Sequence, residues 1–212
     1  MLPRRSFLLR LPALLWLKDS PGLGQNDSSW RSLFDGSGLG QWRVTEFGGE
    51  GTVTVEDGQI LLDFGNDLTG ISWSGDFPVL NYEVSLEAMR VAGEDFFCGL
   101  TFPVRNTFCS FIVGGWAGTV VGLSSLDGLD ASENETQRIM SFRPRHWYSI
   151  RLRVTSEKIE AWIDEGKVVD LLTVDRKISI RPEVEPSRPL GIASWRTRAA
   201  LRNIRMRTVQ AH

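Results

Sequence analysis

Histidine and cysteine are scarce in this 212-residue sequence, which contains two of each. The histidines are His146 and His212, so they cannot supply a three-histidine zinc site or a convincing Ser-His-Asp set. No segment has a convincing helical period, and no repeat of about 20 to 50 residues occurs. These absences argue against zinc and serine-hydrolase chemistry and against propeller or solenoid folds. No cofactor is predicted.

The apolar run at residues 9–17 is too short to span a bilayer, so no stable membrane span is predicted. It follows Arg4-Arg5-Ser6-Phe7-Leu8, and small residues come after it. We interpret residues 1–24 as an export signal that resembles the twin-arginine type, and residues 25–29 as a linker. The alternative is an amphipathic first helix, although Pro12 interrupts it. The signal predicts a periplasmic or extracellular location after cleavage.

The chain is mildly acidic, with a formal net charge of −2 at pH 7. Removing residues 1–24 takes away four basic residues and one acidic residue, so the charge becomes −5. A mildly acidic domain is a poor nucleic-acid binder, and we expect no nucleic-acid partner. Five arginines near the end resemble a basic patch, but their spacing of about two residues favours the solvated face of a last strand: Arg196, Arg198, Arg202, Arg205 and Arg207.

Strand-like segments recur through the rest of the chain. We predict strands at residues 42–47, 52–55, 59–64, 70–74, 81–91, 96–102, 107–113, 119–124, 138–142, 148–155, 158–164, 167–172, 190–195 and 200–208. Ile150, Leu152 and Val154 alternate with polar residues, which indicates one core face and one polar face. We therefore predict an all-β domain over residues 30–209, a jelly-roll sandwich of two antiparallel sheets, followed by a tail at 210–212.

The centre of the chain is dense in aromatic and β-branched residues. Two such runs flank Pro103-Val104-Arg105-Asn106, where proline presets φ for a turn and predicts a hairpin. The second run, at 107–113, has no polar face, so we expect the hairpin at the centre of the two-sheet domain. A turn centred between the first two residues of this tetrapeptide places Cys98 opposite Cys109. Two interpretations stay open for the pair, a disulfide or two buried free thiols.

The order of several short motifs resembles the 3-keto-disaccharide hydrolase family. The matching pieces are Trp30-Arg31-Ser32-Leu33-Phe34-Asp35-Gly36, Leu39-Gly40-Gln41-Trp42, Val55-Glu56-Asp57-Gly58-Gln59-Ile60-Leu61, Asn81-Tyr82-Glu83-Val84, Trp147-Tyr148-Ser149-Ile150, Ala161-Trp162-Ile163-Asp164, Gly191-Ile192-Ala193-Ser194-Trp195 and Leu201-Arg202-Asn203-Ile204. The resemblance implies a concanavalin A-like jelly roll in an exported bacterial protein. It also implies hydrolysis of a keto-disaccharide or related glycoside, with that saccharide as the partner.

Candidate site residues come from separate loops. Glycoside cleavage by the usual route needs two carboxyl groups about 5 to 9.5 Å apart. We take Asp95 and Asp127 as the candidate catalytic pair. The candidate substrate-binding residues are Glu94, Arg105, Trp116, Asp130 and Trp195. The alternative roles are turn formation for the aspartates and core packing for the tryptophans.

We expect any ligand pocket on the concave sheet beside the central hairpin. Because both faces of that sheet read as apolar, the loops at the strand ends would have to supply hydrogen bonds to a sugar. The loop at 127–130 is also a candidate for a structural calcium ion, although it lacks EF-hand spacing. The alternative function is a non-catalytic carbohydrate-binding or cell-surface module of the same fold. The segment 107–113 favours that alternative because it contains no carboxylate.

Overall fold

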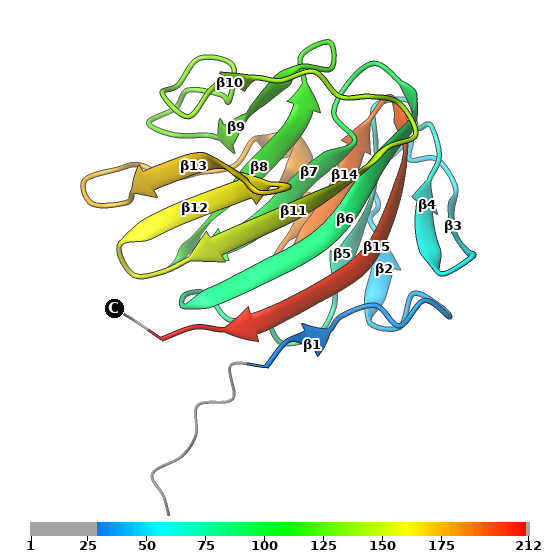
Figure 1. The fold of residues 1–212 in the computed structure, drawn as a ribbon, viewed down its shortest axis with the longest axis horizontal. Helices are drawn as coiled ribbons and strands as arrows, with labels where there is room; N and C mark the ends of the chain where they lie inside the picture. Colours follow the sequence, from blue (N-terminus) through cyan, green and yellow to red (C-terminus); the bar gives the residue numbers. More distant parts are fainter. Residues whose placement is uncertain (1–28, 211–212) are drawn as a thin grey trace, which may run out of the picture.

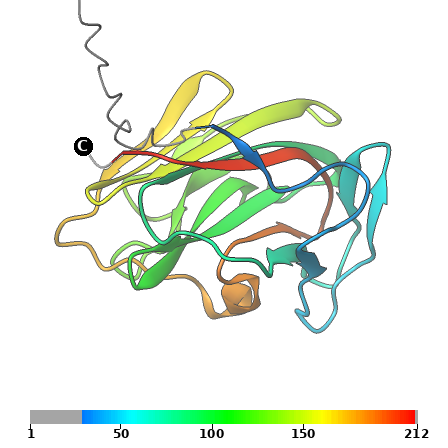
Figure 2. The same cartoon turned by 90° about the horizontal axis from the view of Figure 1, so that it is seen from below.

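The chain folds into two stacked antiparallel sheets. Alternation of apolar and polar residues gives many of the strands one apolar face, and these faces pack together between the sheets. The computed structural model describes residues 29–210, and Figures 1 and 2 show the two layers face-on and edge-on. This arrangement confirms the predicted all-β jelly-roll sandwich. The predicted export signal at 1–24 and most of the predicted linker lie outside the described residues. The described part contains no helix with the length and apolar character needed to cross a membrane.

One sheet has eight strands and the other has seven. The eight-stranded sheet has the order β13-β12-β11-β6-β15-β4-β3, with β1 paired to β15. Its strands are β1 (Arg31–Ser32), β3 (Val53–Glu56), β4 (Gln59–Leu62), β6 (Tyr82–Gly93), β11 (Trp147–Val154), β12 (Lys158–Ile163), β13 (Gly166–Leu172) and β15 (Thr197–Thr208). The seven-stranded sheet contains, in order, β10 (Arg138–Ile139), β9 (Val120–Ser124), β8 (Thr107–Gly115), β7 (Cys98–Val104), β14 (Gly191–Trp195), β5 (Leu68–Trp73) and β2 (Trp42–Val44). Every predicted strand overlaps one of these, while β1 was not predicted.

The core lies between the sheets because each strand turns its apolar residues inward. In β6 the side chains of Tyr82, Val84 and Leu86 are almost fully buried. The Tyr82 hydroxyl donates to the carbonyl of Pro103 at 2.6 Å and so joins the two sheets. The outward residues of β6 include Glu83, which accepts a 2.7 Å bond from Arg207. This polar layer is the outer face of the eight-stranded sheet.

The central hairpin exists, but its turn lies two residues later than predicted. The turn residues are Arg105 and Asn106, and Arg105 has the positive φ of +54° that a tight hairpin turn requires. Pro103 lies inside β7, but β14 pairs only with residues 99–101 of that strand. The missing N–H of Pro103 therefore removes no hydrogen bond between β7 and β14.

This register corrects the predicted pairing of the cysteines. Cys98 faces Val113 and Cys109 faces Phe102, which separates the two by about 13 Å along the hairpin. Both are buried free thiols, so the disulfide interpretation is wrong. Burial raises the pKa of each thiol to about 12.

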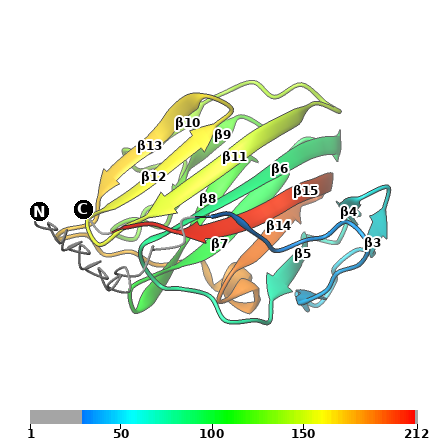
Figure 3. The same ribbon diagram turned by 60° about the horizontal axis from the view of Figure 1, so that its bottom comes forward.

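The segment after β13 crosses the outer face of the seven-stranded sheet. We call residues 173–190 the crossing segment. Ser125 and Ser179 exchange two backbone hydrogen bonds of 2.8 and 3.1 Å, which fix the segment beside β9. It then forms the short 3-10 helix η1 (Pro182–Ser187), seen outside the lower layer in Figure 2 and beside β14 and β5 in Figure 3. The helix packs closely because Gly191 has no side chain: a Cβ there would lie 2.5 Å from the Ser187 carbonyl oxygen. No pattern in the sequence predicted this helix.

Candidate functional site

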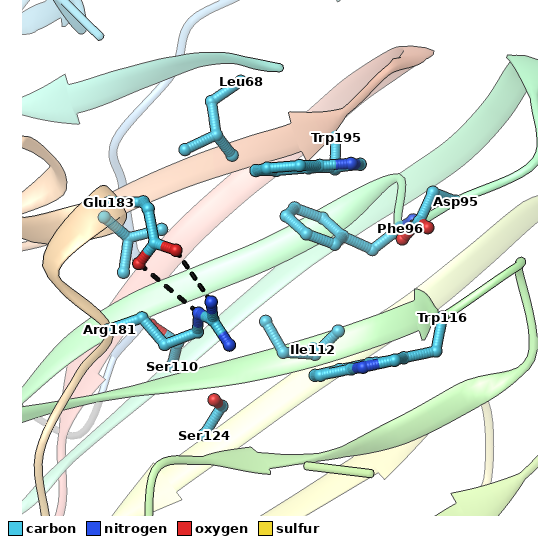
Figure 4. A pocket seen from close by; sticks show the side chains of 11 residues that line it. Leu68, Asp95, Phe96, Ser110, Ile112, Trp116, Ser124, Arg181, Glu183 and Trp195 are labelled. Atoms are coloured by element: carbon cyan, nitrogen blue, oxygen red, sulfur yellow. Dashed lines mark hydrogen bonds and ion pairs between the residues drawn. The ribbon is translucent and has the colours of Figure 1, made fainter. Parts of the chain in front are cut away.

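A pocket of about 270 Å³ lies on the outer face of the seven-stranded sheet, between the crossing segment and the ends of β7, β8 and β14. Its lining residues are Leu68, Asp95, Phe96, Ser110, Ile112, Trp116, Ser124, Arg181, Glu183, Val184 and Trp195, shown in Figure 4. We call this the first pocket. It lies beside the central hairpin.

The floor of the first pocket carries hydroxyl groups. Thr101, Ser110 and Ser124 face one another on β7, β8 and β9 and form a row across the sheet. The Thr101 and Ser110 hydroxyls are 2.9 Å apart, and all three residues are at most 2% exposed. Sequence reasoning missed this row because it took both faces of these strands as apolar. The signal was present in Ser110, which stands between the apolar residues Cys109 and Phe111.

Aromatic rings form opposite walls of the first pocket. Figure 4 shows the indoles of Trp195 and Trp116 edge-on, on either side of the opening. Phe96 packs against Trp195 with ring centroids 6.4 Å apart. Trp116 is 39% exposed, whereas the core tryptophan Trp42 is 0% exposed. An exposed aromatic face beside polar groups suits the apolar face of a sugar ring.

The loop that carries Trp116 is held from beneath by a buried cation. This Trp116 loop, residues 114–118, has positive φ at four of its five positions. Arg90 of β6 donates from Nη2 to the carbonyls of Gly114 at 3.2 Å and Gly118 at 2.9 Å. Its guanidinium also stacks 5.2 Å from the ring centroid of Phe97, and the residue is 7% exposed. Burial lowers the pKa of Arg90 from its ordinary value, although an arginine stays charged in proteins.

Asp95 holds the same loop from the side. Its Oδ2 accepts the backbone N–H of Ala117 at 3.3 Å, and its Oδ1 accepts the N–H of Phe96 at 2.7 Å. The backbone N–H of Asp95 itself donates to the Thr197 hydroxyl at 3.1 Å. The Asp95 carboxylate therefore fixes the position of the Trp116 loop relative to β7.

The crossing segment brings an ion cluster to the first pocket. Arg181 donates from Nη2 to Glu183 at 2.7 Å and from Nη1 to Asp130. Asp130 also accepts bonds from the hydroxyls of Ser124 at 3.2 Å and Ser125 at 3.1 Å. The hydrogen bond from Arg181 lowers the pKa of Glu183, so this carboxylate is ionised at neutral pH. The same contact raises the pKa of Arg181.

The structure brings some of the predicted site residues together. Asp95, Trp116 and Trp195 all line the first pocket. Asp130 lies behind it, because its carboxylate contacts Arg181 and not the pocket space. Sequence reasoning missed Arg181 and Glu183. The stretch around them has two nearby prolines and no periodic pattern, so nothing in it indicates that it folds back over a sheet.

The other predicted residues lie elsewhere. Glu94 is exposed and does not line the first pocket. Arg105 is at the tip of the hairpin, opposite to the end that carries Asp95, and donates to the carbonyl of Ser156. Asp127 accepts bonds from the backbone N–H of Lys177 at 2.8 Å and from Arg176 at 2.7 Å, and these lower its pKa.

No cluster of three or more His, Cys, Asp or Glu side chains that could hold a metal ion occurs within residues 29–210. In the loop proposed for calcium, both aspartates contact arginines. Asp127 pairs with Arg176 and Asp130 pairs with Arg181.

Three solved structures place the fold in a class. A candidate glycosyl hydrolase from Parabacteroides distasonis is 13% identical, with a TM-score of 0.55 over 85% of this chain and 94% of that one. The Crh5 transglycosylase in complex with NAG is 16% identical, with a TM-score of 0.61 over 88% and 86%. The carbohydrate-binding module CBM66 from Bacillus subtilis is 12% identical, with a TM-score of 0.55 over 79% and 96%. The fold is thus the jelly roll of carbohydrate-binding and glycosyl hydrolase domains.

A narrower match comes from the sequence itself. The sequence-family model for the 3-keto-alpha-glucoside-1,2-lyase-like domain matches residues 29–207, and the chain belongs to this family. This membership confirms the resemblance noted in the sequence analysis. No curated protein matches the chain.

Proposed function

We propose that this protein binds a 3-keto-α-glucoside in the first pocket and cleaves its glycosidic bond by elimination. The observation that carries the proposal is one pocket with two facing indoles and an Arg181–Glu183 ion pair. Family membership supplies the substrate class and the reaction type. The aromatic walls would hold the sugar ring, and the ion pair would act on its carbonyl end.

The chemistry needs one base and one electrophilic group. A ketone at C3 of the sugar acidifies the hydrogen at C2. A base removes that proton, the electron pair forms a C1–C2 double bond, and the C1–O bond to the leaving group breaks. The leaving oxygen takes up a proton. This route does not need the two matched carboxyl groups of ordinary glycoside hydrolysis.

Glu183 and Arg181 are the residues that we assign to these roles. Glu183 is ionised, which suits a base. Arg181 carries a permanent charge and donors for a developing enolate oxygen. Asp95 acts in this scheme as a positioning residue for the Trp116 loop. Asp127 has no role in the scheme, because it is paired with Arg176 away from the pocket.

A second candidate function is saccharide binding without turnover. One observation favours it. Asp95 and Asp127, the carboxylates singled out in the sequence, both accept hydrogen bonds from other groups of the protein through both of their oxygens. The likeness to a carbohydrate-binding module fits this candidate as well as it fits an enzyme.

Turnover of a 3-keto disaccharide separates the two candidates. We expect the wild-type protein to release the leaving sugar with formation of an enone, which absorbs in the ultraviolet. Glu183→Gln should lower kcat at least about a hundredfold, the scale of a lost general base. Asp127→Asn is the matched control and should retain activity. Saccharide binding without product from the wild-type protein would favour the binding module, and absence of both would overturn the proposal.

We also propose that the protein is exported and acts in the periplasm or outside the cell. The support is the sequence of residues 1–24, with its paired arginines and short apolar run. Mass spectrometry of the protein recovered from its native host tests this. We expect the mature protein to begin at about residue 25, and a mature protein that retains Met1 would contradict export by a cleaved signal.

A further inference from the structure

A second pocket of about 210 Å³ adjoins the first one. It is lined by Phe47, Gly48, Gly49, Asn66, Asp67, Leu68, Glu183 and Trp195. Leu68, Glu183 and Trp195 line both pockets. The two spaces therefore meet at a shared wall of three side chains and are neighbouring parts of one depression.

The loop at residues 47–49, which forms the far wall of the second pocket, is held in place by hydrogen bonds within the protein. Oε2 of Glu50 accepts the backbone N–H groups of Phe47, Gly48 and Gly49 at 3.0, 2.8 and 3.0 Å. The N–H of Asn66 donates to the Gly49 carbonyl at 2.8 Å. Gly49 has φ +152°, and a Cβ there would lie 2.9 Å from the Asn66 side-chain nitrogen. The loop is thus fixed in a conformation that brings Asn66 to the pocket.

The second pocket offers hydrogen-bonding groups that the protein does not use. Arg196 donates to Oδ1 of Asp67 at 2.6 and 2.9 Å, and Oδ2 has no partner among residues 29–210. The side-chain amide of Asn66 makes no hydrogen bond in that range either. A carboxylate oxygen and an amide together can accept from and donate to adjacent sugar hydroxyls. Trp195, with Arg196 stacked 5.6 Å from its ring centroid, supplies an apolar wall.

We propose that the two pockets form one cleft for two sugar rings, and that the second pocket binds the ring next to the one in the first pocket. This inference rests on the proposed function. Because Glu183 lines both pockets, the bond that joins the rings would lie beside its carboxylate. The second pocket thereby selects disaccharides, and Asn66 and Asp67 are its polar contacts.

The test compares a one-ring probe with a two-ring probe. Methyl 3-keto-α-glucoside and a 3-keto-α-glucosyl-glucose disaccharide are compared by kcat/KM, and their unoxidised forms by calorimetric affinity. Asn66→Ala removes the amide, and Asn66→Trp fills the second pocket. Both changes are at an exposed position, so the fold should persist. Arg105→Ala, at the hairpin tip and outside both pockets, is the matched control.

We expect each Asn66 variant to weaken the two-ring probe about tenfold or more, while the one-ring probe changes less than about twofold. Equal losses for both probes, or no loss for either, would overturn the second-ring site and leave the proposed function intact. Absence of binding and turnover with both probes in the wild-type protein would instead overturn the proposed function, and this inference with it.

Discussion

The Asp95 carboxylate accepts a hydrogen bond from the backbone N–H of Ala117 at 3.3 Å, and this contact joins the start of the central hairpin to the Trp116 loop. Arg90 holds the same loop through two carbonyls. The loop thus has a carboxylate at its N–H side and a guanidinium at its C=O side. Both contacts keep an exposed indole in place at the edge of the first pocket.

Asp95→Asn should act on binding more than on chemistry. Asparagine keeps one acceptor oxygen but turns an NH₂ group toward one of the two backbone N–H groups that Asp95 now accepts. We expect KM to rise about tenfold, with kcat within about threefold of wild type. Steady-state kinetics with a 3-keto disaccharide measures both. A hundredfold fall in kcat at unchanged KM would make Asp95 the catalytic carboxylate of the sequence-based hypothesis.

Arg90→Met should loosen the Trp116 loop and lower stability. The change removes two hydrogen bonds from a buried cation and leaves the carbonyls of Gly114 and Gly118 without these donors. We expect a loss of about 2–3 kcal/mol in the free energy of unfolding. Urea denaturation followed by tryptophan fluorescence measures it. Arg105→Met is the exposed control, and an equal effect from both would contradict the loop-holding role.

Trp116→Ala should impair saccharide binding without unfolding the protein. Trp116 is 39% exposed, whereas Trp42 in the core is 0% exposed. We expect Trp116→Ala to weaken binding at least about tenfold, because an aromatic wall of the pocket is lost. Trp42→Ala should cost about 3–5 kcal/mol in stability. Calorimetry and thermal melting on both variants check this. Unchanged affinity in Trp116→Ala would remove the indole from the site.

The rate should depend on pH through Glu183. Arg181 lowers the pKa of this carboxyl below its ordinary value of 4.5, so the ionised base persists as the pH falls to that range. We expect kcat/KM to fall on the acid side only below about pH 4.5, as Glu183 takes up a proton. In Arg181→Gln the pKa of Glu183 rises toward its ordinary value, so the acid limb should move to higher pH. An acid limb that stays in place would exclude Glu183 as the base.

Both cysteines should be unreactive in the folded protein. Their thiols are buried, and burial raises the pKa of each to about 12, so almost no thiolate exists at pH 8. We expect no reaction with a thiol reagent under native conditions and two reacting thiols in guanidinium chloride. Protein prepared without reductant is the sample to use. Fewer than two thiols after unfolding would indicate a disulfide.

The strands could be predicted because their residues carry local signals. The alternation of Ile150, Leu152 and Val154 with polar residues follows directly from the pleat of β11. The hairpin register could not be predicted, since a proline is typical of a turn and Pro103 instead lies inside β7. The turn depends on Arg105 adopting a positive φ, which a sequence does not reveal for a non-glycine residue.

The candidate site could be predicted only where its residues lie at the ends of the hairpin or of β14. Asp95, Trp116 and Trp195 lie at strand ends that the sequence brings together. Arg181 and Glu183 reach the pocket through a long-range crossing with no periodicity. Asp127 looked equivalent to Asp95 in the sequence, because neither its pairing with Arg176 nor its place in space is encoded locally.

In the proposed function, the crossing segment supplies the reacting groups and the seven-stranded sheet supplies the binding surface. The sheet and the Trp116 loop supply the platform, whereas Arg181 and Glu183 come from one stretch of about 18 residues joined to the rest at two ends. Evolution could therefore exchange the chemistry of this site by altering that single stretch, with both sheets unchanged. If the proposed function is right, changes confined to this segment would be enough to turn a lyase into a saccharide-binding jelly roll on the same two sheets.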